Sequence, residues 1–194
     1  MNPPIKKPPV NGKAKGSGFE STIAKKFSEA FAPLNFKRVP QSGAYAGGQN
    51  VQFNHLYSNA TLGAFVGDIF PANEADVEQA EAWRFRFTIE CKFYKEADNF
   101  SALFKNPQLI GWWEQATADA AKLKDKHPML VFKFNHTPIY AGVDPLHTPL
   151  PNNIQQTLTL RYYANDTQRT LELCVLDDLL KESSWWKMPL SSSL

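Results

Sequence analysis

The sequence predicts an α/β (α+β) domain in which a central mixed β-sheet is flanked by helices. Residues 84–94 alternate between apolar and polar side chains, which is typical of a β-strand. An amphipathic helix over 106–126 and an apolar strand over 128–134 follow it. Because a strand, a helix and a strand in this order form a crossover connection, we expect the two strands to be parallel.

Length and composition restrict the class of protein. The chain has 194 residues, of which 43% are hydrophobic, and this suits one compact domain with a full core. Cys91 and Cys174 lie far apart and predict neither a disulfide framework nor a CxxC metal site. No apolar run is long enough for a signal peptide or a membrane helix. We therefore expect a cytoplasmic protein without a membrane partner.

Residues 1–16 form a basic tail rich in Pro, Gly and Lys, and this composition predicts disorder. No acidic residue accompanies its four lysines, which are Lys6, Lys7, Lys13 and Lys15. Because these lysines supply +4 and the whole chain carries +2, the remaining residues have a net charge of −2. The body of the protein is therefore not basic overall. The tail is either a solubilising terminus or an arm that binds DNA phosphates.

A first helix is predicted over 18–31, with Pro33 just beyond its end. Its apolar stripe consists of Ile23, Ala24, Phe27, Ala30 and Phe31. At about 100° per residue Glu20 lies on this stripe, so we expect its carboxylate to point towards the core. Two interpretations remain open: Glu20 completes a capping box with Ser17, or it serves a site in the interior.

The segment between 36 and 82 contains two short elements. Residues 36–40 suggest a strand or loop, and the Gly- and Ser-rich residues 41–48 suggest a turn. Residues 60–71 suggest a strand that leads into Gly67, Asp68 and Ile69. The acidic stretch 72–82 is predicted to be a loop that connects this strand to the one at 84–94. We expect those two strands to be neighbours.

The strand at 84–94 places two opposite charges beside one another. One face carries its apolar residues, which are Phe85, Phe87, Ile89, Cys91 and Phe93. On the other face Glu90 and Lys92 project about 7 Å apart, with Cys91 buried between them. Either the two side chains share one substrate, or they belong to the solvated face of an antiparallel sheet and pair across strands.

The remaining elements complete the sheet. The helix at 106–126 has Asn106 as its cap and Pro107 in its first turn, and its apolar stripe is Leu109, Trp113, Ala116, Ala120 and Leu123. After the strand at 128–134, residues 136–153 are predicted to be a loop. Residues 155–163 and 170–176 predict a hairpin, and residues 177–186 a short terminal helix. The tryptophan pairs at 112–113 and 185–186 are predicted to anchor the core or an interface.

Two carboxylates and a lysine on adjacent strands are suited to holding a divalent cation against a phosphodiester. Asp68 and Glu90 would supply oxygen ligands to Mg²⁺, and the backbone carbonyl of Cys91 would add another. Lys92 would stabilise charge on the phosphate or help to deprotonate the attacking water. Glu20 would complete or extend the coordination. Mn²⁺ is expected to substitute for Mg²⁺.

The order of these motifs resembles that of the PD-(D/E)xK nuclease superfamily, and within it the Holliday-junction resolvases of archaea and their phage relatives. The matching motifs are, in order, Gly18-Phe19-Glu20, Arg38-x-Pro40-Gln41-Ser42-Gly43-Ala44, Gly67-Asp68-Ile69 and Glu90-Cys91-Lys92. The resemblance implies a restriction-endonuclease-like core over 17–136. Residues 137–194 would then be a C-terminal extension of hairpin and helix packed on the same domain.

The resemblance also implies roles for individual residues. Asp68 and Glu90 would be metal ligands, Lys92 the catalytic lysine and Glu20 an acid linked to the metal. Arg38 and Ser42 would approach the DNA backbone. Gln115 and Lys133 are matched to positions that follow the ExK strand, and they are assigned to DNA binding as well.

The function that the sequence predicts is that of a Mg²⁺-dependent endonuclease acting on branched DNA. A symmetric four-way junction needs two matched cuts, so we expect a homodimer. A phage or mobile-element origin would fit. Two alternatives remain open: a restriction-type endonuclease that reads a base sequence, and a non-catalytic DNA-binding protein on the same fold.

Overall fold

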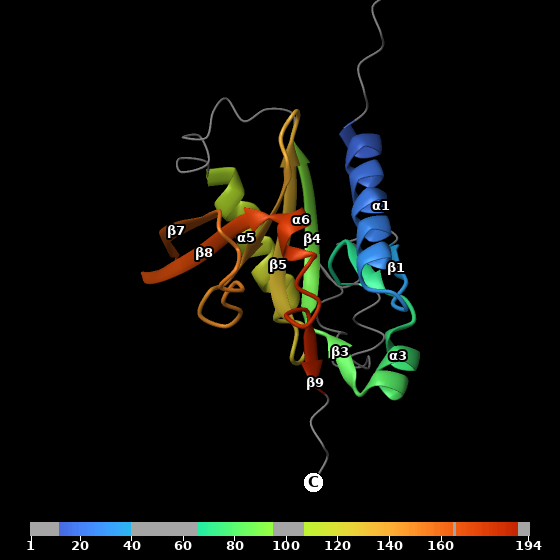
Figure 1. Ribbon diagram of the computed structural model, residues 1–194. Coiled ribbons are helices and arrows are strands. Elements are labelled where there is room, and N and C mark those ends of the chain that lie inside the picture. Colours follow the sequence, from blue (N-terminus) through green and yellow to red (C-terminus); the bar gives the residue numbers. More distant parts are fainter. Residues whose placement is uncertain (1–11, 40–65, 95–106, 165, 190–194) are drawn as a thin grey trace, which may run out of the picture.

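The structure is a computed structural model that describes residues 12–39, 66–94, 107–164 and 166–189 (Figure 1). Its helices are α1 (Gly12–Ala30), α3 (Glu74–Glu81), α5 (Pro107–Ala120) and α6 (Leu176–Leu179). Its strands are β1 (Phe36–Arg38), β2 (Ile69–Pro71), β3 (Trp83–Phe85), β4 (Phe87–Tyr94), β5 (His127–Phe134), β6 (Ile139–Val143), β7 (Thr157–Ala164), β8 (Thr167–Val175) and β9 (Lys187–Pro189).

Some of the predicted features lie outside the described residues. They are the first part of the basic tail (1–11), the turn at 41–48 with the DNA contact Ser42, the start of the strand at 60–65, and the helix cap Asn106.

A seven-stranded mixed sheet forms the centre of the molecule, in the order β1-β2-β4-β5-β6-β8-β7. β4 and β5 are parallel, and Glu90 lies opposite Leu130 in their register. The other pairs of this sheet are antiparallel, including β2 with β4. The predicted mixed sheet, the parallel crossover and the neighbouring strands at 69–71 and 87–94 are therefore confirmed.

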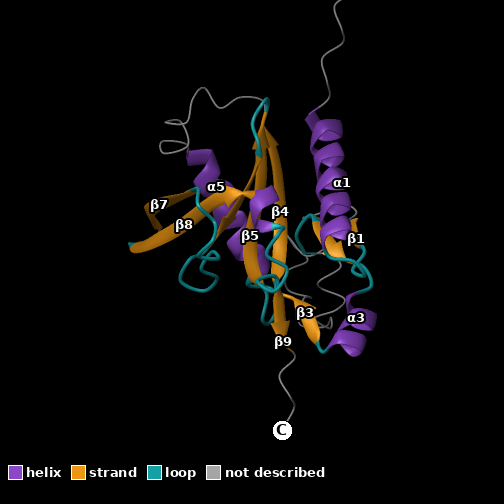
Figure 2. Ribbon diagram, in the orientation of Figure 1, coloured by secondary structure: helices purple, strands orange, loops and turns teal. Residues whose placement is uncertain are grey.

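Helices cover both faces of this sheet (Figure 2). α1 contributes Ile23 and Phe27 to a core that also contains Cys91 and Val131. α5 contributes residues of its predicted apolar stripe to a second core on the opposite face, where Trp113 packs with strand residues such as Leu130 and Phe132. Side chains alternate between the two faces of β4, so Cys91 faces α1 whereas its neighbours Glu90 and Lys92 face the side of α5.

α1 begins at Gly12, six residues before the predicted start, so residues 12–16 are helical although we predicted them to be disordered. A tertiary contact holds this first part of the helix. Lys15 Nζ donates a hydrogen bond to Asn135 Oδ1 at 2.9 Å and lies 4.0 Å from the centre of the Phe93 ring. An ammonium group over an aromatic ring is stabilised by the charge distribution of the ring. This contact was not visible in the composition of the tail.

Two segments that we predicted to be loops contain regular elements. The acidic stretch at 72–82 forms α3, because it consists largely of the helix formers Ala, Glu and Gln and buries Val77. The loop predicted at 136–153 contains β6, which fills the position between β5 and β8. Five residues are too few to reveal the alternation of a strand in the sequence. Gly142 and the flanking prolines also give this segment a composition that is typical of a loop.

The C-terminal segment differs from the single helix that we predicted. α6 has only four residues, and the chain continues through turns into β9, which pairs with β3. The predicted strand at 84–94 is divided at Arg86 for this reason, with β3 and β4 in different sheets. Trp186 is fully buried against Phe27, Phe31 and Phe85, with ring centres 5.0–5.9 Å apart.

None of the helices in the described ranges is long and apolar enough to cross a membrane.

Candidate active site

The candidate site is built around a tight turn before β2. Gly67 has φ +78°, a conformation that residues with a Cβ rarely adopt. A Cβ added at this position would lie 2.8 Å from the carbonyl oxygen of Ile89. The amide of Asp68 donates a hydrogen bond to the same oxygen at 2.8 Å. Glycine at position 67 therefore allows the backbone of the Gly-Asp pair to approach β4 closely.

Asp68 is held against the central strand by both its side chain and its backbone. It is 5% exposed, and its Oδ2 accepts a hydrogen bond from the amide of Cys91 at 2.7 Å. Its carbonyl oxygen accepts from the amide of Val39 at 2.8 Å, just beyond the end of β1. These contacts fix the Asp68 carboxylate beside the segment of β4 that carries Glu90.

Glu90, Lys92 and Gln115 contact one another on the α5 side of the sheet. Lys92 Nζ lies 2.5 Å from Glu90 Oε1, and Gln115 Nε2 donates to the same oxygen at 2.7 Å. Lys92 Nζ also donates to Gln115 Oε1 at 3.1 Å. The side chain of Glu90 is 3% exposed and that of Lys92 is 25% exposed. The cluster therefore reaches the surface through its lysine.

Burial and neighbouring charge raise the pKa of Glu90 to about 7, from an ordinary value near 4.5. Loss of solvation is the largest cause, and the negative charge of Asp68 adds to it, while Lys92 acts in the opposite direction. Burial, together with the charges of the same two carboxylates, raises the pKa of the Cys91 thiol well above its usual range. This cysteine therefore stays protonated and is not a nucleophile.

The position of β4 excludes the alternative that Glu90 and Lys92 belong to a solvated face of an antiparallel sheet. β4 lies inside the sheet between β2 and β5, and it pairs in parallel with β5. Glu90 is buried, and α5 reaches it through the hydrogen bond from Gln115. Two carboxylates are thus kept close together in an environment of low polarity, which costs free energy unless a cation or a proton compensates.

Glu20 lies in the middle of α1, away from its ends, and its carboxylate pairs with Arg38 of β1. Because α1 begins at Gly12, Ser17 is not at the start of the helix, and the capping-box interpretation is wrong. The Glu20 side chain is 14% exposed, and its Oε2 accepts a hydrogen bond from Arg38 Nε. Its negative charge also contributes to the raised pKa of Cys91, so Glu20 lies near this part of β4, on the side of α1.

The structure brings together only part of the predicted DNA-binding set. Gln115, which the resemblance assigns to DNA binding, is hydrogen-bonded to Glu90 and Lys92, and its contact with DNA stays a prediction. The crossover from β4 to β5 was the signal for the contact with Glu90, because it lays α5 over the face that carries Glu90. Lys133 lies opposite Phe93 in the β4–β5 register, and therefore on the other face of the sheet from Lys92.

The two buried carboxylates fit a hard divalent cation. Mg²⁺ commonly binds through one or two carboxylates, keeps several waters and takes further oxygens from substrate phosphates. In the part of the chain that the structure describes, no group of three His, Cys, Asp or Glu side chains is placed to hold a metal ion. Asp68 and Glu90 would therefore share the ion with water and substrate. The carbonyl of Cys91 and the carboxylate of Glu20 stay predictions as ligands.

Comparison with protein families gives one match that covers most of the chain. Residues 11–187 match a family model described as "Phage putative PDDEXK endonuclease". Searches of curated proteins and of solved structures found no match. The matched range includes Asp68, Glu90 and Lys92, as well as the segment after residue 136 that lies beyond the predicted core.

Proposed function

The chain belongs to the family of phage putative PDDEXK endonucleases, and we propose on this basis that it uses Mg²⁺ to hydrolyse phosphodiester bonds of branched DNA. One observation carries the proposal. Two buried carboxylates, Asp68 and Glu90, lie beside a lysine that is fixed by contacts of 2.5 and 3.1 Å to Glu90 and Gln115. This donor set combines the charges needed to bind a cation and a phosphate in one place.

The residues of the site have separable roles in this proposal. Asp68 is fixed by the amide of Cys91, and Glu90 is fixed by Gln115, so both carboxylates are oriented before substrate arrives. Lys92 places a positive charge at the exposed edge of the cluster, where it would stabilise the negative charge of the phosphate. A bound Mg²⁺ or Mn²⁺ ion would supply charge stabilisation and lower the pKa of the attacking water.

The preference for branched DNA is supported by the order of the motifs, which resembles that of Holliday-junction resolvases. A homodimer would suit such a substrate, because a twofold axis presents two sites to the two strands that must be cut. In this proposal Arg38 and Ser42 approach the DNA backbone. Arg38 is engaged by Glu20 and is 38% exposed, so it retains a surface that a phosphate can contact.

A direct assay tests the substrate. Labelled four-way junction, linear duplex and single strand are each incubated with the protein in Mg²⁺, in Mn²⁺ and in EDTA. We expect paired, symmetric cuts in the junction in either metal and none in EDTA. Cleavage of every duplex at one sequence would support a restriction-type enzyme instead. Binding of DNA without cleavage in either metal would support a non-catalytic protein.

Two substitutions test the metal site in the same assay. Asp68→Asn and Glu90→Gln each remove a carboxylate while keeping the volume of the side chain, so we expect cleavage to be lost and DNA binding to remain. Glu29→Gln is the matched control, because Glu29 is exposed on α1 and contacts only Lys25 among the ion pairs of described residues. Near wild-type turnover of either site variant would refute the metal assignment.

A further inference from the structure

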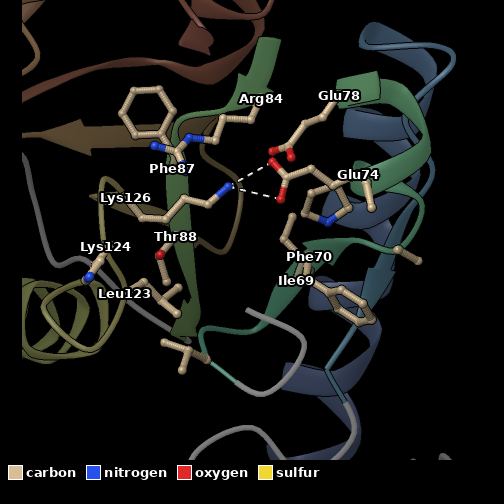
Figure 3. A pocket seen from close by; sticks show the side chains of 14 residues that line it. Ile69, Phe70, Glu74, Glu78, Arg84, Phe87, Thr88, Leu123, Lys124 and Lys126 are labelled. Atoms are coloured by element: carbon tan, nitrogen blue, oxygen red, sulfur yellow. Dashed lines mark hydrogen bonds and ion pairs between the residues drawn. The ribbon is translucent and has the colours of Figure 1, made fainter. Parts of the chain in front are cut away.

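The face of β4 that carries the candidate site becomes more exposed towards the end of the strand. Its side chains are, in order, Thr88, Glu90, Lys92 and Tyr94. Thr88 is buried and lines a pocket between β2, α3 and the segment that follows α5 (Figure 3). Glu90 is buried as well, whereas the side chain of Lys92 is 25% exposed and Tyr94 is 45% exposed. This face of the strand therefore opens to solvent at Lys92 and Tyr94.

Two neighbouring contacts between β4 and α5 place Tyr94 at the border of the candidate site. Lys92 is hydrogen-bonded to Gln115, and the ring centre of Tyr94 lies 6.0 Å from that of Trp112, three residues earlier on α5. Residues three apart on a helix are neighbours on its surface, and residues two apart on a strand are about 7 Å apart on one face. A phosphate that meets Lys92 would therefore lie beside the ring of Tyr94.

The ring of Tyr94 rests on a packed aromatic core. Trp112 is half-buried, and its ring centre lies 6.4 Å from those of Phe132 and Phe134 on β5. These two phenylalanines belong to the core between the sheet and α5. A tyrosine ring has few rotatable bonds, so a ring that is already held in this way loses little conformational freedom when a ligand stacks on it. Tyr94 thus presents aromatic surface at a fixed position.

Exposed rings of this kind are rare in the described part of the chain. Its exposed large apolar side chains are Tyr94, Leu146 and Tyr163. Leu146 follows β6, and Tyr163 lies on β7 at the far edge of the sheet, so Tyr94 alone of the three belongs to the strand of the candidate site. Isolated apolar side chains are common on protein surfaces, and it is the position of Tyr94 beside Lys92 that indicates a ligand.

We infer that Tyr94 stacks against one nucleobase of the DNA strand that is cut. This inference rests on the proposed nuclease function, in which Lys92 meets the phosphate at the cut. The sugar and base attached to a phosphate span a distance similar to the step from Lys92 to Tyr94, so the base of this nucleotide can reach the ring. Every base has a π-face, hence stacking on an aromatic side chain needs no particular base sequence.

Such a contact also bears on the choice of DNA structure. A base can stack on a protein ring only after it has left its neighbours in the duplex, and this costs least where pairing is already disturbed. Stacking on Tyr94 would therefore favour branched DNA over linear duplex.

Photochemical cross-linking tests the contact without cleavage. In a labelled four-way junction, 5-iodouracil replaces one thymine at a time around the cut, and the complex with wild-type protein is irradiated in EDTA. Irradiated iodouracil couples efficiently to an aromatic side chain that stacks on it. We expect mass spectrometry of the digested product to locate a cross-link on Tyr94 at one or two adjacent positions. This test needs no variant of the protein.

Matched substitutions separate stacking on DNA from packing within the protein. Tyr94→Leu keeps an apolar side chain against Trp112 but removes the ring, whereas Tyr94→Phe keeps the ring. Tyr163→Leu is the control, because Tyr163 is an exposed tyrosine on β7, which β5, β6 and β8 separate from β4. Each changed residue is exposed, so we expect all three variants to have a Tm close to that of wild type.

The affinity for the junction is then measured in EDTA. Tyr94→Leu should bind about tenfold more weakly than Tyr163→Leu, a loss within the range for one stacked base, and Tyr94→Phe should bind like wild type. An abasic nucleotide at the cross-linked position should weaken binding of the wild type by a similar factor. Tyr94→Leu should lose nothing further on that junction, because the same contact is already missing.

The outcomes separate this inference from the nuclease function. Binding without a cross-link to Tyr94 at any position, or equal affinities of Tyr94→Leu and Tyr163→Leu, would overturn the stacking contact, while cleavage by the wild type would leave the nuclease function standing. A smaller oligomer for Tyr94→Leu than for Tyr163→Leu in size-exclusion chromatography would assign the ring to an interface between copies and would also overturn it. A cross-link to Tyr94 without cleavage in Mg²⁺ or Mn²⁺ would refute the nuclease function and not the stacking contact.

Discussion

Replacing Glu90 by glutamine should make the metal-free protein more stable at neutral and alkaline pH. The pKa of Glu90 is about 7 in the folded protein, against about 4.5 when the chain is unfolded. The folded state binds the proton of Glu90 more tightly than the unfolded chain does. The contribution of this proton to the free energy of unfolding is therefore complete below pH 4.5 and is lost as the pH rises to 7. At about 1.4 kcal/mol for each pH unit, Glu90 lowers the free energy of unfolding by about 3 kcal/mol at pH 8 and by about 1 kcal/mol at pH 5, relative to its value at low pH.

Glutamine removes this cost, since it stays neutral and its carbonyl can still accept the hydrogen bond from Gln115. Thermal unfolding in EDTA should therefore show Glu90→Gln melting about 6–12 °C above wild type at pH 8, and only slightly above it at pH 5. Glu29→Gln, which changes an exposed carboxylate, should have the same Tm as wild type at both pH values. Addition of Mg²⁺ at pH 8 should raise the Tm of wild type more than that of Glu90→Gln. A variant that is less stable than wild type at pH 8 in EDTA would refute the reasoning.

Lys92→Ala should lose cleavage yet bind DNA, as measured by titration with labelled junction; weak binding with normal cleavage at saturation would make Lys92 a phosphate anchor. Glu20→Gln should slow cleavage by orders of magnitude. Its free energy of unfolding should change by less than about 1 kcal/mol, because the ion pair between Glu20 and Arg38 is partly exposed. Full activity of this variant would mean that Glu20 serves only as a partner of Arg38. Gly67→Ala should be destabilised by about 1–3 kcal/mol in denaturant unfolding and lose activity, because its φ of +78° and the 2.8 Å approach to Ile89 leave no room for a Cβ; an unchanged midpoint would contradict this. Deletion of residues 1–11, which carry Lys6 and Lys7, should lower the slope of log affinity against log salt by about 1.8, and an unchanged slope would make the tail passive.

The sequence predicted the centre of the molecule better than its periphery. The alternation at 84–94 and the stripe of α5 each repeat over many residues, so the central strand and the crossover helix were evident. β6 has five residues and lies between prolines, and its pairing with β8 depends on contacts that are distant in the chain. Local patterns carry little information about such pairings.

In the candidate site, too, features set by a single strand were predicted, whereas contacts between different elements were not. Glu90 and Lys92 could be placed side by side because the geometry of one strand determines their spacing. The crossover indicates that α5 covers the face with Glu90, but the choice of Gln115 as the partner of Glu90 depends on the rotation of α5 over the sheet. The pairing of Glu20 with Arg38 likewise requires the relative position of α1 and β1.

The burial of Trp186 has a consequence for synthesis of the protein. This ring completes the aromatic core around Phe27 of α1 and Phe31 just after it, although the two ends of the contact are separated by most of the chain. A nascent chain on the ribosome cannot form this contact until residue 186 has emerged. Until then several phenylalanine rings stay without their final partner, which favours aggregation and recognition by chaperones. A prematurely terminated chain that contains every proposed catalytic residue would therefore still lack the ring that completes this core.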